Sequence, residues 1–591
     1  MSNKKKKGHG KVTFKPYDQD QMWLLPPSLN ELIGPNHIVR LVNRAIDQMD
    51  LDPILNTYEG GGASNYHPRV LLKALVYGYI EKIYSSRAIE KALKENICFM
   101  WLCGMQSPDH NTLNRFRNGI LKTTVKDVFS HVLVLLIEQG YVRLNDYYVD
   151  GSKIEAVSNR YTAVWAKNVA RYKTGLLEKI QIILEQIESH NEEAEEQSRQ
   201  ASTQKTTEKI EDSEALAKTV SDINQTLSEQ LDKDKNLRRK VDKLKNEHLP
   251  KLQGYEEQER LLKDRNSYSK TDPDATMMRM KEDHLGTGQL KPAYNIQIGT
   301  EDQFIVGYSV HQNAGDATLL IPHLEQTHQM LQAAGYAKPK RIGADGAYGS
   351  EQNYDYLEFE DYDNYVKFPG YYHEQKRKHK NNIFHRDNLF YNRNENYFVC
   401  PMGQKLTLFK TGTSKTKTGY EFEENIYKAQ RCQDCPLRGQ CHQSSQDRQI
   451  RIRPNLERHK QQARKNLNSL RGIRMRKKRS VDVEPVFGHI KTNRKFNRFM
   501  LRSVEKVSVE MGILAIAHNL KKWWKKIEQG ISVPIFPTFP TNETNRIAKT
   551  MLFLKFLPDS FSKVSDGHVK LFNFETNTLS YTQAQKLKQY F

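Results

Sequence analysis

Cysteine is scarce in this chain, with six residues in 591, and four of the six fall within positions 400–441. So few cysteines exclude a disulfide-built secreted scaffold, and their clustering favours metal binding over disulfide bridging. Long apolar runs are also missing, because the longest, residues 131–137, is far too short to cross a bilayer. The basic N-terminus is followed by no apolar stretch, which argues against a signal peptide. We therefore expect a soluble, cytoplasmic protein.

Acidic residues are outnumbered by basic ones: the chain has 91 Lys and Arg against 70 Asp and Glu, a formal net charge of +21. An excess of this size indicates a polyanionic partner, because basic side chains that neutralise phosphates release counterions. A ribosome-associated or merely basic protein is the alternative that charge alone leaves open. The length exceeds what one hydrophobic core usually organises, so we expect roughly two to four domains.

Helical patterns fill the first 140 residues after a basic start. Apolar residues recur at helical spacing along residues 68–80, and His67-Pro68 is a typical helix start. Two more helix starts follow, at Ser85 and within residues 107–112. Short helices separated by tight turns suit a helix-turn-helix-like DNA reader, and an ordinary helical bundle fits the pattern equally well. The candidate DNA contacts on the last of these helices are Arg115 and Arg117.

A strand pattern at residues 145–156 ends this helical region, and a different composition follows. Between residues 166 and 262, Glu, Lys and Gln are abundant and the apolar residues have heptad-like spacing. Two long helices joined at a polar tip, residues 192–214, would form an antiparallel coiled-coil hairpin. Such an insertion could serve as a dimer arm, a DNA clamp or a passive spacer.

Alternating strand patterns return after residue 267. Strands are predicted at residues 294–298 and 304–310, followed by a helix over residues 316–335 that ends at Gly335. A further strand, residues 340–344, runs directly into an Asp-Gly pair. This order of elements is typical of a mixed sheet flanked by helices.

Two aspartates, Asp150 and Asp345, share one context: each ends a short apolar strand and is followed at once by glycine. Ligands and metals gather at the carboxyl ends of strands in α/β sheets. Phosphodiester chemistry needs hard oxygen ligands that hold two divalent ions roughly 3.5–4 Å apart. A single Asp-Gly pair usually marks only a turn, so the inference depends on the two occurring together.

A third carboxylate, Glu484, lies in a basic segment directly before Pro485. Because proline fits the first turn of a helix and little further, we predict Glu484 at or near a helix start. Lys491, seven residues on, would then lie on the same face of the helix. Asp482 is the competing carboxylate, and a basic surface helix without catalytic function is the simpler interpretation.

Together these motifs resemble those of bacterial insertion-sequence transposases of the DDE class, most closely the 1182 group. The motifs are Tyr-Val-Asp150-Gly-Ser-Lys, Gly-Ala-Asp345-Gly-Ala-Tyr and Val-Glu484-Pro-Val-Phe-Gly-His-Ile-Lys491, supported by residues 24–27, 271–275 and 497–502. The resemblance implies an RNase H-like core that cleaves the ends of an insertion sequence and joins the freed 3′-hydroxyl to target DNA. It also implies two Mg²⁺ (or Mn²⁺) ions, a homodimer in the synaptic complex, and action at the bacterial nucleoid.

The resemblance also implies roles for individual residues. The expected catalytic and Mg²⁺-binding residues are Asp150, Asp345 and Glu484. Basic side chains around Glu484 would hold the phosphate backbone beside the metals. The candidate DNA contacts there are Arg474, Arg476, Lys478, Arg479 and Lys491.

The chain departs from the family pattern at one point. Relatives often carry tyrosine and arginine seven and four residues before the final glutamate, and here those positions hold Lys477 and Ser480. Arg479 lies one residue early, so its role stays open. A nuclease that cuts without joining and a non-catalytic DNA-binding regulator are the alternative functions.

The cysteine cluster predicts a structural zinc site. Two cysteines two residues apart can chelate a tetrahedral ion from one turn, and two more can complete the set. The candidate ligands are Cys400, Cys432, Cys435 and Cys441, with His442 able to replace one sulfur. Reduced, unliganded thiols are the alternative.

The predicted domain organisation combines these regions. It comprises a basic disordered arm (residues 1–18), a helical DNA-binding domain (19–140), an RNase H-like catalytic core (141–530), and a linker with a C-terminal tail (531–591). Within the core, residues 166–262 form the coiled-coil insertion and residues 395–445 a small zinc-ribbon-like insertion.

Overall fold

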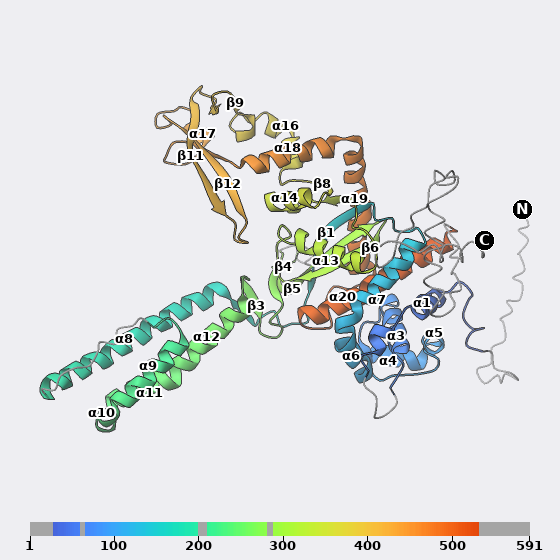
Figure 1. The fold of residues 1–591 in the computed structure, drawn as a ribbon, viewed down its shortest axis with the longest axis horizontal. Coiled ribbons are helices and arrows are strands. Elements are labelled where there is room, and N and C mark those ends of the chain that lie inside the picture. Colours follow the sequence, from blue (N-terminus) through green and yellow to red (C-terminus); the bar gives the residue numbers. More distant parts are fainter. Residues whose placement is uncertain (1–27, 59–64, 199–209, 281–287, 531–591) are drawn as a thin grey trace, which may run out of the picture. The chain divides into compact units, whose positions relative to one another are not determined.

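The computed structural model describes residues 28–58, 65–198, 210–280 and 288–530 (Figure 1). The chain divides by its internal contacts into two units, residues 1–531 and 532–591, and every described residue lies in the first. The predicted basic arm, the motif at residues 24–27 and the predicted tail lie outside the described residues. None of the described helices combines the length and apolarity needed to cross a membrane.

The described chain begins with a set of helices. They are α1 Ile38–Asp47, α2 Asp52–Leu55, α3 Pro68–Ile80, α4 Ser86–Glu95, α5 Ile97–Leu102, α6 His110–Asn118 and α7 Ile120–Glu138. The three predicted helix starts are confirmed, because the side chains of His67, Ser85 and Asp109 accept hydrogen bonds from first-turn N–H groups of α3, α4 and α6.

These helices pack against α20, Val504–Glu528, the last helix of the described chain. α20 is buried along most of its length and contacts α1, α3, α6 and α7. Its buried Glu510 accepts hydrogen bonds from the Tyr79 hydroxyl of α3 at 3.0 Å and from the backbone N–H groups of Met500 and Leu501. The N-terminal helices therefore share one hydrophobic interior with the end of the described core.

A six-stranded mixed sheet joins the elements that carry the predicted carboxylates. Its strands are β1 Asp146–Glu155, β4 Thr276–Arg279, β5 Leu290–Glu301, β6 Phe304–His311, β7 Arg341–Ala344 and β8 Asp363–Val366. β5 pairs antiparallel with β1, β4 and β6. β7 pairs in parallel with β1 on one side and β8 on the other. This arrangement confirms the predicted α/β class with a mixed sheet.

Helices flank this sheet. They are α13 Leu320–Ala333, α14 Glu351–Phe359, α18 Pro454–Asn468, α19 Leu470–Gly488 and α20. α13 ends near Gly335 as predicted, where φ is +81°, but it begins four residues later than the predicted start at Asp316. The Asp316 Oδ1 accepts hydrogen bonds from Asn295 and Gln297 of β5, and the residue at the N-cap of α13 is Leu319 instead.

A helical insertion separates β1 from β4. It starts and ends at an antiparallel pair of short strands, β2 Ala163–Trp165 and β3 Ser267–Ser269. α8, Ala166–Ser198, is one long helix, whereas the return path is broken (Figure 1). Its parts are α9 Ser213–Thr226, α10 Ser228–Lys233, α11 Lys235–Lys243, the π-helix η1 Leu244–His248 and α12 Leu249–Leu262.

The insertion therefore differs from the predicted pair of continuous helices. The side chain of Asp234 caps α11, which begins a new helix there, and η1 ends two residues before Pro250. Because proline has no N–H and crowds the preceding turn, it disturbs the regular hydrogen-bond ladder at this point. Buried apolar residues of α8 and of the return path, among them Ile180, Leu216 and Leu252, nevertheless form a single cluster.

A second sheet follows β8 in the chain. It is antiparallel, with the order β13-β12-β11-β10-β9, and its strands are β9 Phe390–Asn392, β10 Tyr397–Val399, β11 Lys405–Lys415, β12 Glu421–Ala429 and β13 Gln449–Ile452. Short helices accompany it: α15 Tyr371–Glu374, α16 Arg377–Lys380, the 3-10 turn η3 Arg386–Asn388, and α17 Arg438–Cys441. Its buried cluster is small and centres on Leu406 and Tyr427.

Candidate functional site

Asp150 and Asp345 lie side by side because of the parallel register of β1 and β7. The last paired residues of this ladder are Val149 and Ala344, so the next residue on each strand is an aspartate. Asp345 follows the end of β7, as predicted. Asp150 does not end its strand, because β1 continues to pair with β5 as far as Glu155. The carboxylate therefore lies at the end of the β1–β7 ladder but within the longer β1 strand.

Glu484 belongs to α19, which packs across β1, β5 and β7. The prediction that it lies at a helix start is wrong, because α19 begins at Leu470 and Pro485 lies inside the helix. Proline has no N–H to donate to the carbonyl one turn earlier, that of Val481. The side-chain amide of Gln303 donates to that carbonyl instead, at 2.7 Å. A partner from the β5–β6 turn thus compensates for the proline.

Arg479 joins the three carboxylates. Its Nη2 lies 2.9 Å from Glu484 Oε1 and 3.9 Å from Asp345 Oδ1, and its Nη1 lies 3.8 Å from Asp150 Oδ2. Arg479 is buried, whereas the Asp345 and Glu484 side chains are 51% and 49% exposed. The three predicted carboxylates are thus brought together around one positive charge. The role that the sequence left open for Arg479 is, in this structure, that of their shared counter-ion.

Burial and charge act differently on the two aspartates. Burial raises the pKa of Asp150 to about 6, against the opposing effects of Arg479 and the Gly151 N–H. Burial alone would also raise the pKa of Asp345, but the Gly346 N–H, Arg479 and Lys367 together lower it. Lys367 Nζ lies 3.4 Å from the Asp345 carboxylate. The two neighbouring carboxyls therefore have pKa values that are shifted in opposite directions.

Asp482, the competing carboxylate, points elsewhere. It is 2% exposed, and its Oδ1 accepts hydrogen bonds from the Thr300 hydroxyl at 2.7 Å and the Gln303 backbone N–H at 2.9 Å. It anchors α19 to the β5–β6 turn. Lys491 is buried and lies in a π-helical turn, η4 His489–Asn493, so the seven-residue spacing from Glu484 does not follow a regular α-helix.

A buried hydrogen bond connects the Asp345 turn to β5, the strand that pairs with β1 beside Asp150. The Tyr348 hydroxyl, in the 3-10 turn η2 Gly346–Tyr348, donates to Gln297 Oε1 on β5. Gln297 lies opposite Gly151, and a Cβ on that glycine would come within 2.3 Å of the Gln297 amide nitrogen. Any side chain after Asp150 would therefore have to displace the Gln297 amide, which explains the glycine in one of the two Asp-Gly pairs. Tyr348 closes the sequence motif around Asp345, but for Gln297 the only signal was the glycine opposite it.

The predicted DNA contacts divide into exposed and buried groups. Arg115 and Arg474 are exposed. Lys478 pairs with Asp302 at 2.9 Å and lines a pocket beside β1 with Arg471, Arg474 and Arg341. Arg476 is partly buried and donates to the Leu467 carbonyl.

Arg117 does not fit its predicted role. It is 3% exposed and donates to the Tyr84 carbonyl at 3.2 Å and to the Asn114 side chain at 2.9 Å. Its guanidinium is therefore committed to the interior of the helical region, and Arg115, two residues earlier, is the one that faces outward.

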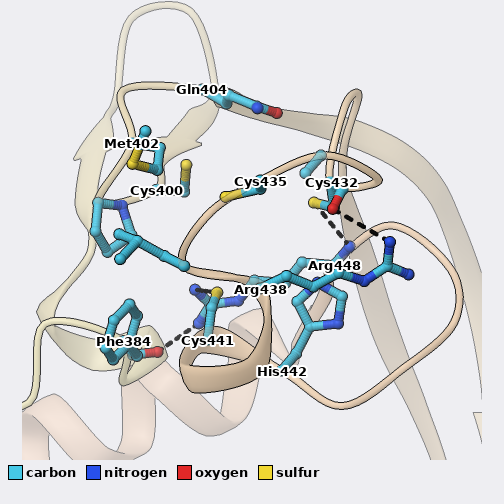
Figure 2. Close-up of a pocket in the computed structure, with 13 residues that line it drawn as sticks. Phe384, Cys400, Met402, Gln404, Cys432, Cys435, Arg438, Cys441, His442 and Arg448 are labelled. Atoms are coloured by element: carbon cyan, nitrogen blue, oxygen red, sulfur yellow. Dashed lines mark hydrogen bonds between the residues drawn. The ribbon is translucent and has the colours of Figure 1, made fainter.

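The four clustered cysteines line one pocket beside the second sheet (Figure 2). Cys400 follows β10, Cys432 and Cys435 follow β12, and Cys441 ends α17. Arg448 contacts two of the sulfurs: its backbone N–H lies 3.4 Å from Cys432 Sγ, and its Nη1 lies 3.0 Å from Cys441 Sγ. In the described part of the chain, no three of these sulfurs lie within 4.8 Å of one another as a ready ligand set.

His442 adds a second observation at this pocket. Both of its ring nitrogens are buried and have no hydrogen-bond partner among the described residues. Buried imidazole nitrogens normally find a partner, so this one is consistent with a missing ligand. Four thiols and an imidazole are ligands that suit a zinc ion. In this structure the four sulfurs do not surround a common point.

Two regions of the chain match models of known families. Residues 27–119 match a model described as a transposase domain (DUF772), and residues 399–524 match a transposase DDE domain. The second match includes Glu484, Arg479 and the cysteine cluster, whereas Asp150 and Asp345 lie outside both. No curated protein and no solved structure matches the chain.

The matches, together with the mixed sheet, support a DNA-cutting and DNA-joining enzyme of the DDE class. More particularly, the pair of matches supports an insertion-sequence transposase. Such a family implies DNA as the partner and a divalent metal ion as the cofactor.

Proposed function

We propose that this protein is a DNA transposase that cleaves the ends of an insertion sequence, of the 1182 group, and joins the freed 3′-hydroxyl to target DNA. The observation that carries the proposal is the convergence of Asp150, Asp345 and Glu484 on Arg479. These residues come from β1, the turn after β7, and α19, three elements far apart in the chain. The sheet order, with β5, β1, β7 and β8 adjacent, is compatible with an RNase H-like core.

The three carboxylates fit a pair of divalent ions. They offer hard oxygen donors. Among the described residues, the one cation within 4 Å of all three carboxylates is the guanidinium of Arg479. Mg²⁺ or Mn²⁺ bound there would activate the attacking oxygen and stabilise the leaving oxygen of an in-line displacement. Asp150 and Asp345 would be ligands from the sheet, and Glu484 would complete the set from the helix. Arg479 would then be free to turn toward a phosphate.

The DNA backbone would lie over the basic side of α19. Arg471, Arg474 and Lys478 line a pocket with Tyr148 of β1, close in sequence to Arg479. Positive charge at that place would hold a phosphate backbone beside the metals. The helices α1–α7, with Arg115 exposed, would bind element ends, and the insertion at residues 166–262 would serve a homodimeric synaptic complex at the bacterial nucleoid.

Zinc would have a structural role in the second sheet. Cys400, Cys432, Cys435 and Cys441 would hold it, or His442 in place of one sulfur. Arg448 donates hydrogen bonds to two of the sulfurs, but burial raises the pKa of the Cys441 thiol, so zinc itself would have to displace that proton on binding. Binding would draw the loops after β10 and β12 together.

The decisive experiment uses purified protein, Mg²⁺ and labelled DNA that carries the inverted repeats flanking its own gene. We expect nicks at the element ends and joined products. Asp345→Asn and Glu484→Gln should each reduce both by about 10³-fold or more, because a metal ligand contributes several kcal/mol to the transition state. Glu358→Gln is the matched control, since this exposed carboxylate pairs with Arg458 on the surface.

The possible outcomes separate the alternative functions. Joined products that disappear in the two variants and persist in the control support the transposase. Cleavage without joining would indicate a nuclease. Binding without cleavage in Mg²⁺ or Mn²⁺ would indicate a DNA-binding regulator.

A further inference from the structure

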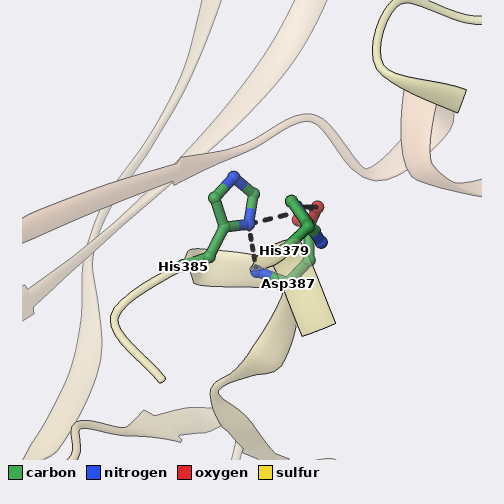
Figure 3. Close-up of side chains that lie close together, drawn as sticks. All are labelled: His379, His385 and Asp387. Atoms are coloured by element: carbon green, nitrogen blue, oxygen red, sulfur yellow. Dashed lines mark hydrogen bonds and ion pairs between the residues drawn. The ribbon is translucent and has the colours of Figure 1, made fainter. Parts of the chain in front are cut away.

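A histidine-rich turn lies between the two sheets in the chain, apart from the carboxylates and from the cysteines. His379 belongs to α16, and His385 and Asp387 lie at the start of the 3-10 turn η3. The three side chains face one another in the loop that joins these short helices (Figure 3). Nothing in the proposed transposase chemistry uses them.

The donor atoms of these three residues lie at metal-binding separations. Asp387 Oδ2 is 3.4 Å from His385 Nδ1 and 3.9 Å from His379 Nε2, and all three donors lie within 4.8 Å of one another. A tetrahedral zinc ion with bonds of about 2.0–2.2 Å holds neighbouring donors roughly 3.4 Å apart. The two distances from Asp387 therefore lie within about half an ångström of the zinc value, and all three donors lie within 4.8 Å of one another.

The surroundings position these donors. The rings of His379 and His385 approach with centroids 4.2 Å apart. The other carboxylate oxygen of Asp387 accepts from Arg386 Nε at 3.3 Å, which leaves Oδ2 directed at the imidazoles. The Asn388 side chain donates to the His379 carbonyl at 2.7 Å and thereby holds η3 against α16. His379 is buried, whereas His385 and Asp387 are about one-third exposed, so an ion has access from solvent.

A second group of this kind is already satisfied within the protein. Asp355 accepts from His459, Asn455 and Tyr420, and both oxygens of Glu358 are held by Arg458. All of these partners are side chains that join α14 to α18 and to the second sheet. That group is a polar contact between elements. In the histidine-rich turn, His385 Nδ1 accepts one long hydrogen bond, from the Asp387 backbone N–H at 3.4 Å, and an ion bound there would replace it.

We propose that His379, His385 and Asp387 bind a divalent first-row transition-metal ion, with zinc as the physiological occupant. Two imidazole nitrogens and one carboxylate oxygen suit zinc and its neighbours, whereas Mg²⁺ prefers an all-oxygen shell. The ion would pin α16 to η3 with an open coordination position toward solvent. The turn also contacts the cysteine pocket, because the Phe384 carbonyl accepts a hydrogen bond from Arg448. The chain would then carry two zinc sites linked by one arginine.

A cobalt titration of the purified full-length protein tests this site. Co²⁺ is added in excess Mg²⁺, which occupies an all-oxygen site without displacing Co²⁺ from histidine. We expect two classes of bound Co²⁺: one at the cysteines, with a thiolate-to-cobalt charge-transfer band, and one at this site, whose absorption spectrum has no such band. The affinity of the second class should fall at least tenfold in Asp387→Asn and in His385→Ala, because each removes one of three ligands.

The controls separate this site from the cysteines and from folding. His373→Ala should leave the affinity unchanged, because that ring lies 5.1 Å from the His379 ring but is outside the ligand set. Cys435→Ser should alter only the charge-transfer band. Circular dichroism identifies the variants that fold. His385 and Asp387 are the ligands to substitute, because both are partly exposed and their loss disturbs packing less than loss of the buried His379.

Either result decides the question. Selective loss of the thiolate-free cobalt in the Asp387 and His385 variants supports the proposal. The proposal would be overturned if all folded variants bound Co²⁺ with the same affinity, or if all bound Co²⁺ had thiolate ligands. The turn would then hold only a hydrogen-bonded His–Asp pair. Transposition activity is not the readout, so the result is independent of the proposed function.

Discussion

The carboxylates beside the mixed sheet and the thiols beside the second sheet differ in what holds them together. Asp150 and Asp345 are adjacent because two paired strands end their ladder at Val149 and Ala344. The cysteines lie in loops, and among the described residues no three of their sulfurs form a compact set. Hydrogen bonds of the backbone therefore define one site, whereas the other depends on segments with little regular structure.

The two regions also differ in their counter-charges. The carboxylates share the guanidinium of Arg479, a buried cation from the chain itself. The sulfurs receive hydrogen bonds from Arg448, but His442 keeps two buried ring nitrogens that no described residue satisfies. A site with an internal counter-ion can fold before its metal arrives. A site with unsatisfied donors gains most of its order from the ion.

Removal of the zinc proposed for the cysteine pocket should therefore have the largest effect, and it should be local. A zinc-selective chelator in excess Mg²⁺ is expected to raise protease cleavage within residues 400–448 by on the order of tenfold or more, because structural zinc contributes most of the folding energy of such loops. Limited proteolysis with mass spectrometry measures this. Cleavage near α19 should not change, and uniform cleavage across the chain would contradict the contrast between the two regions.

Loss of Arg479 should have the next largest effect. Arg479→Met leaves three carboxylates without their shared cation, so the free energy of unfolding without metal should fall by about 2–3 kcal/mol at neutral pH. The loss is smaller than for a fully buried pair because Asp345 and Glu484 are half exposed. Mg²⁺ should stabilise this variant more than the parent protein, as measured by denaturant unfolding.

Arg476→Met provides the control for that experiment. Arg476 lies on the same helix, donates to the Leu467 carbonyl and stacks beside Tyr371. It contacts none of the three carboxylates, so Mg²⁺ should stabilise this variant as it does the parent. Equal Mg²⁺ stabilisation of the Arg479 variant would mean that the guanidinium and the metal do not compete.

The opposite pKa shifts of the two aspartates predict opposite effects of amide substitution. The raised pKa of Asp150, about 6, means that the folded protein holds a proton there which the unfolded chain releases near pH 4. The folded state thus loses stability as the pH rises from 4 to 6. Asp150→Asn avoids this loss and should stabilise the metal-free protein by about 1–2 kcal/mol at pH 7, with no gain below pH 4.

Asp345→Asn is the internal comparison. The pKa of Asp345 is lowered, so its ionised form contributes stability above its ordinary pKa, and that contribution is lost as the pH falls. This substitution should therefore destabilise the metal-free protein at neutral pH. Thermal unfolding between pH 4 and 7 measures both variants, and shifts of the same sign would contradict the electrostatic account.

The smallest effect should come from the hydrogen bond between Tyr348 and Gln297. A double-mutant cycle of Tyr348→Phe and Gln297→Leu should give a coupling energy of about 1 kcal/mol, the usual contribution of one buried hydrogen bond. Each single variant should also weaken Mg²⁺ binding, because the Asp345 turn loses its tie to β5. Additive variants with normal Mg²⁺ affinity would show that the strand register alone positions the aspartates.

Local signals predicted the parts of this fold that depend on local structure. The starts of α3, α4 and α6 follow from single capping residues, and the end of α13 follows from Gly335. The two aspartates were found because an apolar strand before Asp-Gly is visible in the sequence. In each case the physical cause lies within a few residues of the signal.

The errors arise where a distant residue changes the outcome. Pro485 predicted a helix start, but Gln303 satisfies the carbonyl that the proline leaves without a donor. Arg117 looked like an exposed arginine of a short helix, yet Tyr84 and Asn114 bind it internally. The spacing of residues 166–262 predicted two continuous helices, but a capping aspartate and a proline divide the second. None of these partners could be identified without the tertiary structure.

The packing of α20 against α3 and α7 has a consequence for the order in which the protein is made. The apolar faces of the first helices are completed by a helix that begins roughly 370 residues after α7 ends. At about 5–20 residues per second, a ribosome needs on the order of 20–70 s to reach it. The N-terminal helices of each new chain therefore remain without this partner until α20 has been synthesised. On the function proposed above, this order would keep a nascent chain from presenting a finished DNA-recognition surface before its catalytic residues have emerged.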